Sequence, residues 1–158
     1  MLRPDVTDLR EFYSGPLGQT ARRLLRARLR AIWPSVAGQR VLGLGYAIPY
    51  LGVFRDEAER VLAAMPAAQG VLRWPSNEPS VTVLAEEDEL PFADMSIERV
   101  LLIHALESSD NVPDLMREVW RVLTPSGRLL VAVPNRRGLW ARFEHTPFGQ
   151  GHPYTPRQ

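Results

Sequence analysis

Five short apolar runs restrict the folds that this sequence can adopt. They occupy residues 40–45, 60–65, 80–85, 99–103 and 128–133. Each run has the length of a strand, and a nearly uninterrupted apolar run is typical of a parallel strand that is covered on both faces. We expect the second and third runs to be buried strands. The segments between the runs can hold crossover connections, so the pattern predicts an α/β fold with a doubly wound, mostly parallel sheet and helices on both faces.

Two other segments have the periodicity of amphipathic helices. Apolar residues recur at spacings of three and four from Leu17 to Trp33, and Pro34 ends this pattern. The arginines of this segment are not interleaved with aromatic residues, which favours a solvated helix face over a surface for RNA. A second helix is expected after a cap at Asp110 or Asn111. Its apolar face would comprise Leu115, Met116, Val119, Trp120 and Leu123.

The size and composition of the chain fit one globular domain. Its 158 residues, 45% of them hydrophobic, are sufficient for a single core. We divide the domain into an N-terminal helical segment (1–38), a central core (39–134) and a C-terminal helix and loop (135–158). The chain has no cysteine, so a thiolate zinc site is excluded, no metal is expected, and a reducing cytoplasm is the expected compartment. No apolar run approaches the ~20 residues of a membrane span.

The turn after the first apolar run is a candidate ligand site. In a doubly wound sheet, ligands bind beyond the carboxyl ends of the strands, and glycines in the first strand-to-helix turn allow a close approach to the backbone. This turn contains Gly43 and Gly45, and Pro49 suits the first turn of a following helix. Two glycines alone are also compatible with an ordinary tight turn.

Four motifs, taken in order, resemble those of class I S-adenosylmethionine-dependent methyltransferases. Residues 41–49 are similar to the nucleotide-binding turn of that family, and residues 86–92, Glu-Glu-Asp-Glu-Leu-Pro-Phe, resemble its acidic segment before the fourth strand. The sequence His-Ala-Leu-Glu at 104–107 stands where the family has residues after that strand. Residues 123–129, Leu-Thr-Pro-Ser-Gly-Arg-Leu, resemble its Leu-x-Pro-Gly-Gly turn. The ordered set is more specific than any single motif.

The resemblance implies a Rossmann-like fold with S-adenosylmethionine as the cofactor and an unidentified methyl acceptor. Gly45 and Ala47 would face the methionine and sugar portions, and Tyr46 would contribute a backbone N–H. A carboxylate after the third strand would lie beside the adenine. We also expect Gly45→Val to prevent cofactor binding without unfolding the protein. The cofactor-binding residues implied in this way are Gly43, Gly45, Tyr46, Ala47, Glu86, Glu87 and His104.

The resemblance says less about the acceptor. His104 would lie near the sulfonium end of the cofactor, although a histidine at a strand end is also compatible with a structural role, which we favour over that of a base. No Asn-Pro-Pro-Tyr-like sequence follows the fourth strand, so a small-molecule or protein acceptor is expected rather than a nucleic acid. The candidates on the acceptor side are Tyr13, His145, Phe148 and Tyr154.

Three positions depart from the family pattern. Gly43 replaces the acidic residue usual near the cofactor's amino group, and Pro49 replaces the last glycine. Met65 and Pro66 occupy the end of the second strand, where a carboxylate normally holds the ribose hydroxyls. Cofactor binding is therefore expected to be weaker unless another acidic residue substitutes. The nearest acidic residues in the sequence are Asp56, Glu57 and Glu59.

Two other functions remain open. One is a catalytically inactive methyltransferase-like scaffold or binding subunit. The other is a nicotinamide-dinucleotide domain, against which the absence of Gly-x-Gly-x-x-Gly spacing argues. Class I methyltransferases normally add two strands after the fifth, and this sequence ends before they could appear. We therefore expect a sheet without these two strands, whose edge is covered by a partner chain or a missing C-terminal segment.

Overall fold

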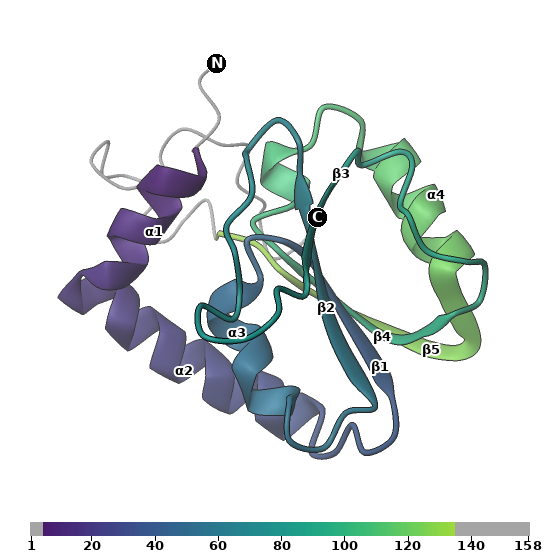
Figure 1. Cartoon of the computed structure of the whole chain (residues 1–158), viewed down its shortest axis with the longest axis horizontal. Helices are drawn as coiled ribbons and strands as arrows, with labels where there is room; N and C mark the ends of the chain where they lie inside the picture. Colours follow the sequence, from purple (N-terminus) through teal and green to yellow (C-terminus); the bar gives the residue numbers. More distant parts are fainter. Residues whose placement is uncertain (1–4, 135–158) are drawn as a thin grey trace.

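A computed structural model describes residues 5–134 and is built around one parallel sheet (Figure 1). The five strands have the order β3-β2-β1-β4-β5, and every neighbouring pair is parallel. This arrangement confirms the predicted α/β, Rossmann-like fold. The strands are β1 (Arg40–Gly45), β2 (Arg60–Pro66), β3 (Thr82–Ala85), β4 (Ile97–Ile103) and β5 (Leu123–Ala132).

Helices cover both faces of the sheet (Figure 1). Helices α1 (Val6–Ser14), α2 (Pro16–Ile32) and α3 (Ile48–Leu51) lie on one face, and α4 (Val112–Val122) lies on the other. Two short 3₁₀ turns, η1 (Gly52–Phe54) and η2 (Leu106–Ser108), follow α3 and β4. Among the residues that the structure describes, no helix has the length and apolar character needed to cross a membrane.

The central strands fill the core on both sides because their side chains alternate between the two faces. Val41 and Leu101 belong to the hydrophobic cluster beneath α1, α2 and α3, whereas Leu42 and Leu102 belong to the cluster beneath α4. All four side chains are inaccessible to solvent. Burying one such side chain contributes about 1.5–3 kcal/mol, so β1 and β4 hold the two layers together.

The surroundings of several predicted elements differ from expectation. Strand β3 is not buried: Val83 and Leu84 are exposed because β3 forms an edge of the sheet. Trp120, which the periodicity assigned to the apolar face of α4, is 82% exposed. Along α2, Leu29 is fully buried but Leu24 is exposed. Helical spacing identifies an apolar stripe, but the docking angle of the helix decides which part of the stripe meets the sheet.

The ends of the helices follow local sequence signals. Helix α1, which the apolar pattern did not predict, begins after Asp5, whose side chain accepts from the Thr7 N–H in a capping box. Asn111 caps α4, as one of the two predicted caps. The predicted turn after α4 lies inside β5, where the pairing with β4 shifts register.

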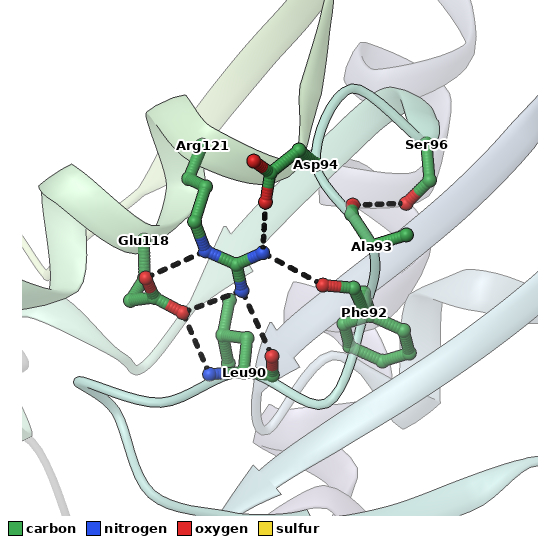
Figure 2. A network of polar contacts seen from close by, with 7 residues as sticks. All are labelled: Leu90, Phe92, Ala93, Asp94, Ser96, Glu118 and Arg121. Atoms are coloured by element: carbon green, nitrogen blue, oxygen red, sulfur yellow. Dashed lines mark hydrogen bonds and ion pairs between the residues drawn. The ribbon is translucent and has the colours of Figure 1, made fainter.

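Arg121 of α4 holds the loop that leads from β3 to β4 (Figure 2). Its guanidinium donates to the carboxylates of Glu118 and Asp94 and to the carbonyl oxygens of Leu90 and Phe92. The carboxylate of Glu118 also accepts from the Leu90 N–H at 2.8 Å. The Leu-Pro-Phe segment is thereby fastened to α4, and the acidic residues before it are held at the end of β3.

The pair formed by Glu118 and Arg121 predicts a pH dependence of stability. The hydrogen bond from Arg121 lowers the pKa of Glu118 below its ordinary value of 4.5. Because the folded pKa lies below the unfolded one, the pair contributes stability above that ordinary value, and the contribution is lost as the pH falls through the folded pKa. We expect the urea midpoint of the wild type to fall more steeply between about pH 5 and pH 3 than that of Glu118→Gln. Parallel curves for the two proteins would contradict this prediction.

Candidate functional site

A hollow lies at the carboxyl ends of β1, β2, β3 and β4. Its inner part is lined mostly by apolar side chains, among them Met65, Leu90 and Leu115. Its outer part contains about 570 Å³ of space that opens to solvent. The two parts share Pro66, Glu86 and Glu87. The cavity volume of the outer part is about 220 Å³, somewhat below the roughly 300–1,000 Å³ of typical ligand pockets, so a bound nucleoside would extend into the open mouth of the hollow.

The two glycines of the β1 turn are required by packing within the protein. Gly45 lines the hollow and has φ +77°, and a Cβ atom there would lie 2.4 Å from the carbonyl oxygen of Ile103. A Cβ atom on Gly43 would lie 2.6 Å from that of Ala47, so no acidic side chain fits at this position. The expectation that Gly45→Val leaves the fold intact is therefore wrong, because the substituent would collide with the backbone of β4.

Tyr46 and Ala47 are buried beside α1 rather than in the walls of the hollow. The N–H of Tyr46 donates to the carbonyl oxygen of Ile103 at 2.8 Å, so the structure gives this N–H a partner within the protein. The Tyr46 ring stacks on that of Tyr13, with ring centroids 5.7 Å apart and an interplanar angle of 16°.

The acidic segment contributes one wall of the hollow. Glu86 and Glu87 directly follow β3 and line both parts, and Asp88 and Asp110 line the outer part. The carboxylate of Glu87 accepts from the hydroxyl of Ser109 at 2.5 Å. The outer hollow therefore carries carboxylates on the side of β3 and the α4 cap.

The side chains at the end of β2, which pairs with the end of β3, include no carboxylate. Met65 and Pro66 line the hollow there. The acidic residues that could substitute by sequence proximity, Asp56, Glu57 and Glu59, precede β2 and therefore lie at the amino ends of the strands. Glu57 is also paired with an arginine of α2. Their position therefore excludes these three residues as replacements for the missing carboxylate at the end of β2.

A buried chain of polar side chains lies beside the end of β4. The hydroxyl of Tyr50 donates to that of Tyr13 at 2.6 Å, and the Tyr13 hydroxyl lies 2.8 Å from Nε2 of His104. Nδ1 of His104 lies 2.9 Å from a carboxylate oxygen of Glu107. Since Tyr13 accepts from Tyr50, its own proton is directed to Nε2. Nδ1 then carries the ring proton and donates to Glu107.

Four separate elements assemble this chain. Tyr13 comes from α1, Tyr50 from α3 and Glu107 from η2, while His104 directly follows β4. His104 has φ +53°, a left-handed conformation that costs roughly 1–2 kcal/mol for a residue other than glycine. Sequence reasoning found His104 and Tyr13 separately and missed the other two. The three-residue spacing of His104 and Glu107 was a local signal, whereas nothing local links Tyr13 to a residue 91 positions away.

Burial fixes the protonation state of the phenol at the centre of this chain. Loss of solvent, followed by the neighbouring Tyr50, raises the pKa of Tyr13 well above its ordinary value. Tyr13 therefore stays neutral at physiological pH and keeps the proton that it donates to His104.

Tyr13→Phe should destabilise the protein by about 1–3 kcal/mol, because it leaves Nε2 of His104 and the hydroxyl of Tyr50 without their partner. The measurement is the free energy of unfolding in urea. Tyr46→Phe is the matched control, since the Tyr46 hydroxyl makes no hydrogen bond within residues 5–134. Equal losses in the two variants would show that the chain does not stabilise the fold.

The structure thus brings Gly45, Glu86 and Glu87 together around the hollow and joins Tyr13 to His104 beside it. Gly43, Tyr46 and Ala47 do not line the hollow. Gly43 packs against Ala47, and the Tyr46 N–H bonds to Ile103, so these residues stabilise the turn. The other candidates on the acceptor side, His145, Phe148 and Tyr154, lie outside the described residues.

The chain matches a known protein family along most of its sheet. A family model described as a methyltransferase domain matches residues 42–131, from β1 to β5. No curated protein matches the sequence. The match includes the last three motifs on which the resemblance is based and the first from residue 42 onward, and it confirms that resemblance.

Several solved structures share the fold. A methyltransferase from Archaeoglobus fulgidus has 19% identity and a TM-score of 0.65, with 97% of this chain and 70% of that chain covered. A methyltransferase from Haloferax volcanii, solved in complex with the activator Trm112, has 20% identity and a TM-score of 0.61, with 79% and 58% covered. The YcgJ protein from Bacillus subtilis has 21% identity and a TM-score of 0.59, with 70% and 50% covered.

The chain therefore spans about half the length of the Bacillus subtilis protein. At these identities the structural likeness establishes the fold, and the family model establishes the relationship. The protein belongs to the family of class I S-adenosylmethionine-dependent methyltransferases.

Proposed function

We propose that the protein binds S-adenosylmethionine in the hollow and transfers its methyl group to an acceptor. The observation that carries this proposal is the hollow at the carboxyl ends of the strands, with Glu86 and Glu87 on one wall, in a chain of this family. When bound, the cofactor supplies a methyl group activated by a sulfonium charge. The adenine would lie in the outer part against Pro66, Ala67 and Ala68, and Glu86 would accept from its exocyclic amine.

The residues fit the adenosine half of the cofactor better than its other polar groups. Apolar side chains next to carboxylates in the outer part match a flat base that carries one amine donor. The cofactor's amino group has no acidic partner at Gly43, where packing against Ala47 excludes one. We therefore place the main binding contribution at the adenine.

The buried chain supports an acceptor that loses a proton during methyl transfer. Nε2 of His104 would take this proton only after the Tyr13 hydroxyl gives up its hydrogen bond to it, and the carboxylate of Glu107 would stabilise the resulting imidazolium. We propose His104 as the base, with Glu107 and Tyr13 as positioning residues. The sequence alone favours a structural role for His104, and its burial and two hydrogen bonds are also compatible with that role.

Titration calorimetry with S-adenosylhomocysteine tests the binding site. We expect a Kd within about 1 μM–1 mM, the common range for enzyme ligands. Glu86→Gln should weaken binding about tenfold by removing a charged acceptor. Glu89→Gln is the matched control, because Glu89 belongs to the same acidic segment but is not among the residues lining either part of the described hollow. A titration without heat at high protein concentration would favour the alternative, an inactive methyltransferase-like scaffold.

Methyl transfer can be tested before the acceptor is known. The protein is incubated with trideuteromethyl-labelled cofactor and with the small-molecule or protein fraction of a cell extract, and labelled products are identified by mass spectrometry. His104→Asn should slow product formation by about 10²–10⁴-fold while leaving the affinity for S-adenosylhomocysteine unchanged. Binding without any labelled product would again favour the scaffold.

The edge strand β5 is a further part of this proposal. In the described residues, β5 pairs only with β4. One structural neighbour is a methyltransferase bound to an activator. We propose that a partner chain or a further segment of the protein pairs with β5, because exposed strand edges readily pair. Light scattering after size exclusion would detect a second copy on this edge.

A further inference from the structure

Three side chains hold the phenol ring and hydroxyl of Tyr13. The hydroxyl accepts from that of Tyr50 at 2.6 Å and lies 2.8 Å from Nε2 of His104. The ring stacks on that of Tyr46, with centroids 5.7 Å apart and an interplanar angle of 16°. We call Tyr46, Tyr50 and His104 the phenol site. Together they provide one hydrogen-bond donor, one hydrogen-bond acceptor and one flat aromatic surface.

The phenol site adjoins the hollow at the turn after β1. Gly45 lines the inner part of the hollow, as does Ala105. A Cβ atom on Gly45 would lie 2.4 Å from the carbonyl oxygen of Ile103 and 3.0 Å from the Cβ atom of Ala105. Ile103 and Ala105 are the residues on either side of His104. A ligand in the hollow and a phenol on His104 would therefore lie close to each other at the end of β4.

The hydrogen bonds of the phenol site fit a neutral hydroxyl group. The donor on Tyr50 needs a lone pair on the bound atom, and Nε2 of His104 needs a proton from it. A hydroxyl oxygen offers both a lone pair and a proton, whereas a carboxylate has no proton to give and an ammonium group has no lone pair. The stacked ring of Tyr46 adds a preference for an aromatic compound.

The side chain of Tyr13 can leave the phenol site without movement of its helix. Its backbone packs closely on α2, because a Cβ atom on Gly18 would lie 2.7 Å from the Cα atom of Tyr13. A change of the Tyr13 rotamer would vacate the site while α1 stays in place. A ligand that makes the same stacking contact and the same two hydrogen bonds would offset the contacts that Tyr13 loses.

We propose that the methyl acceptor is a phenol and that Tyr13 occupies the acceptor's place in this structure. The acceptor ring would stack on Tyr46, and its hydroxyl would accept from Tyr50 and donate to His104. This inference rests on the proposed function, because it assumes that S-adenosylmethionine binds in the hollow and that His104 is the base.

The transfer step balances in atoms and charge. A lone pair of the phenol oxygen forms a bond to the methyl carbon, the bond between sulfur and that carbon breaks, and its electron pair stays on sulfur. The phenol proton passes to Nε2 of His104, while Glu107 accepts from the N–H at Nδ1 at 2.9 Å. The products are an aryl methyl ether, S-adenosylhomocysteine and an imidazolium, which then releases its proton to solvent.

Trideuteromethyl-labelled cofactor tests the inference on the wild type. The acceptors offered are substituted phenols, the matching anilines and benzoates, and N-acetyltyrosine amide. We expect labelled aryl methyl ethers to form at least about tenfold faster than labelled amines or esters. The rates with N-acetyltyrosine amide and with the free phenols distinguish a protein tyrosine from a small-molecule acceptor. Faster labelling of the anilines or benzoates, or no labelled ether from any phenol, would overturn the inference.

Tyr13→Ala provides a second test, because alanine keeps the Cβ atom and the substitution removes a phenol. Phenol should bind this variant at least about tenfold more tightly than benzene, which cannot bond to Tyr50 or His104. The bound phenol should be converted to labelled anisole, and adding His104→Asn should slow this conversion by about 10²–10⁴-fold. Phe12→Ala is the matched control on the same helix. Its missing ring carries no hydroxyl, so this variant should not prefer phenol to benzene.

The outcomes separate the inference from the proposed function. Phenol that binds Tyr13→Ala without forming anisole would show that Tyr13 is only structural, and the inference would be wrong. Binding of S-adenosylhomocysteine, measured in the same samples by calorimetry, would leave the proposed function in place. If S-adenosylhomocysteine fails to bind the wild type, the proposed function is contradicted and the inference falls with it. If circular dichroism shows that Tyr13→Ala does not fold, the wild-type acceptors decide the question.

Discussion

Gly45→Ala is expected to destabilise the protein by about 4 kcal/mol or more, which is exceptional for a single methyl group. The new Cβ atom would lie 2.4 Å from the carbonyl oxygen of Ile103 and 3.0 Å from the Cβ atom of Ala105. These atoms belong to the end of β4 and the residues after it, which pack against β1. Neither can move without disturbing the parallel pairing of the two central strands.

Gly38→Ala separates the effect of space from that of backbone conformation. Gly38 has φ +67° and Gly45 has φ +77°, but a Cβ atom on Gly38 would meet nothing within 4 Å. Its substitution should cost only the roughly 1–2 kcal/mol of a left-handed conformation. Urea unfolding of both variants measures the difference. If both variants lose a similar free energy of unfolding, the end of β4 moves aside at little cost. The proposal of a rigid turn would then be wrong.

Arg121→Met is expected to cost about 2–4 kcal/mol and to weaken cofactor binding. The substitution leaves the Glu118 carboxylate and the carbonyl oxygens of Leu90 and Phe92 without their shared donor (Figure 2). The loop that positions Glu86 would lose its attachment to α4. Affinity for S-adenosylhomocysteine should therefore fall even though Arg121 is not among the residues lining the described hollow.

Arg117→Met is the matched control on the same helix. Arg117 pairs with Asp114, but its side chain is 73% exposed, whereas that of Arg121 is 31% exposed. Exposed ion pairs contribute about 0–1 kcal/mol, so this variant should unfold almost as the wild type does. Denaturation and calorimetry on both variants provide the comparison. Equal stability of the two variants would mean that the loop is held by its apolar contacts instead.

Much of the fold follows from local patterns. The runs at 40–45, 60–65 and 99–103 became β1, β2 and β4, because a nearly continuous apolar run of this length is stable only when both faces are covered. The cap at Asn111 was predictable for a similar reason, since its side chain bonds to an N–H three residues away. Such signals need no knowledge of the rest of the chain.

Other features could not be read from local patterns. The exposure of Val83 depends on β3 being an edge strand, and strand order is a property of the whole sheet. Likewise, Trp120 follows the apolar residue Val119 in sequence but lies about 100° further around α4, on its solvent side. The pattern correctly identified amphipathic elements and misjudged how they are oriented.

In the candidate site, too, some parts could be predicted from local patterns and others could not. The acidic segment and the glycine turn were recognisable because each is a short motif at a strand end. The chain from Tyr50 through Tyr13 and His104 to Glu107 was not, because α1, α3 and the end of β4 meet only after the sheet has formed. Hydrogen bonds between such distant residues leave no periodic trace in the sequence.

The sequence by itself determined the class of fold and the end of the sheet at which a ligand would bind. Those properties depend on apolar periodicity and on motifs a few residues long. Only the tertiary structure decided that Gly45 serves strand packing, that Asp56, Glu57 and Glu59 lie at the wrong end of the sheet, and that Tyr13 reaches His104. These facts depend on distances across the folded core, which are set by how the layers pack.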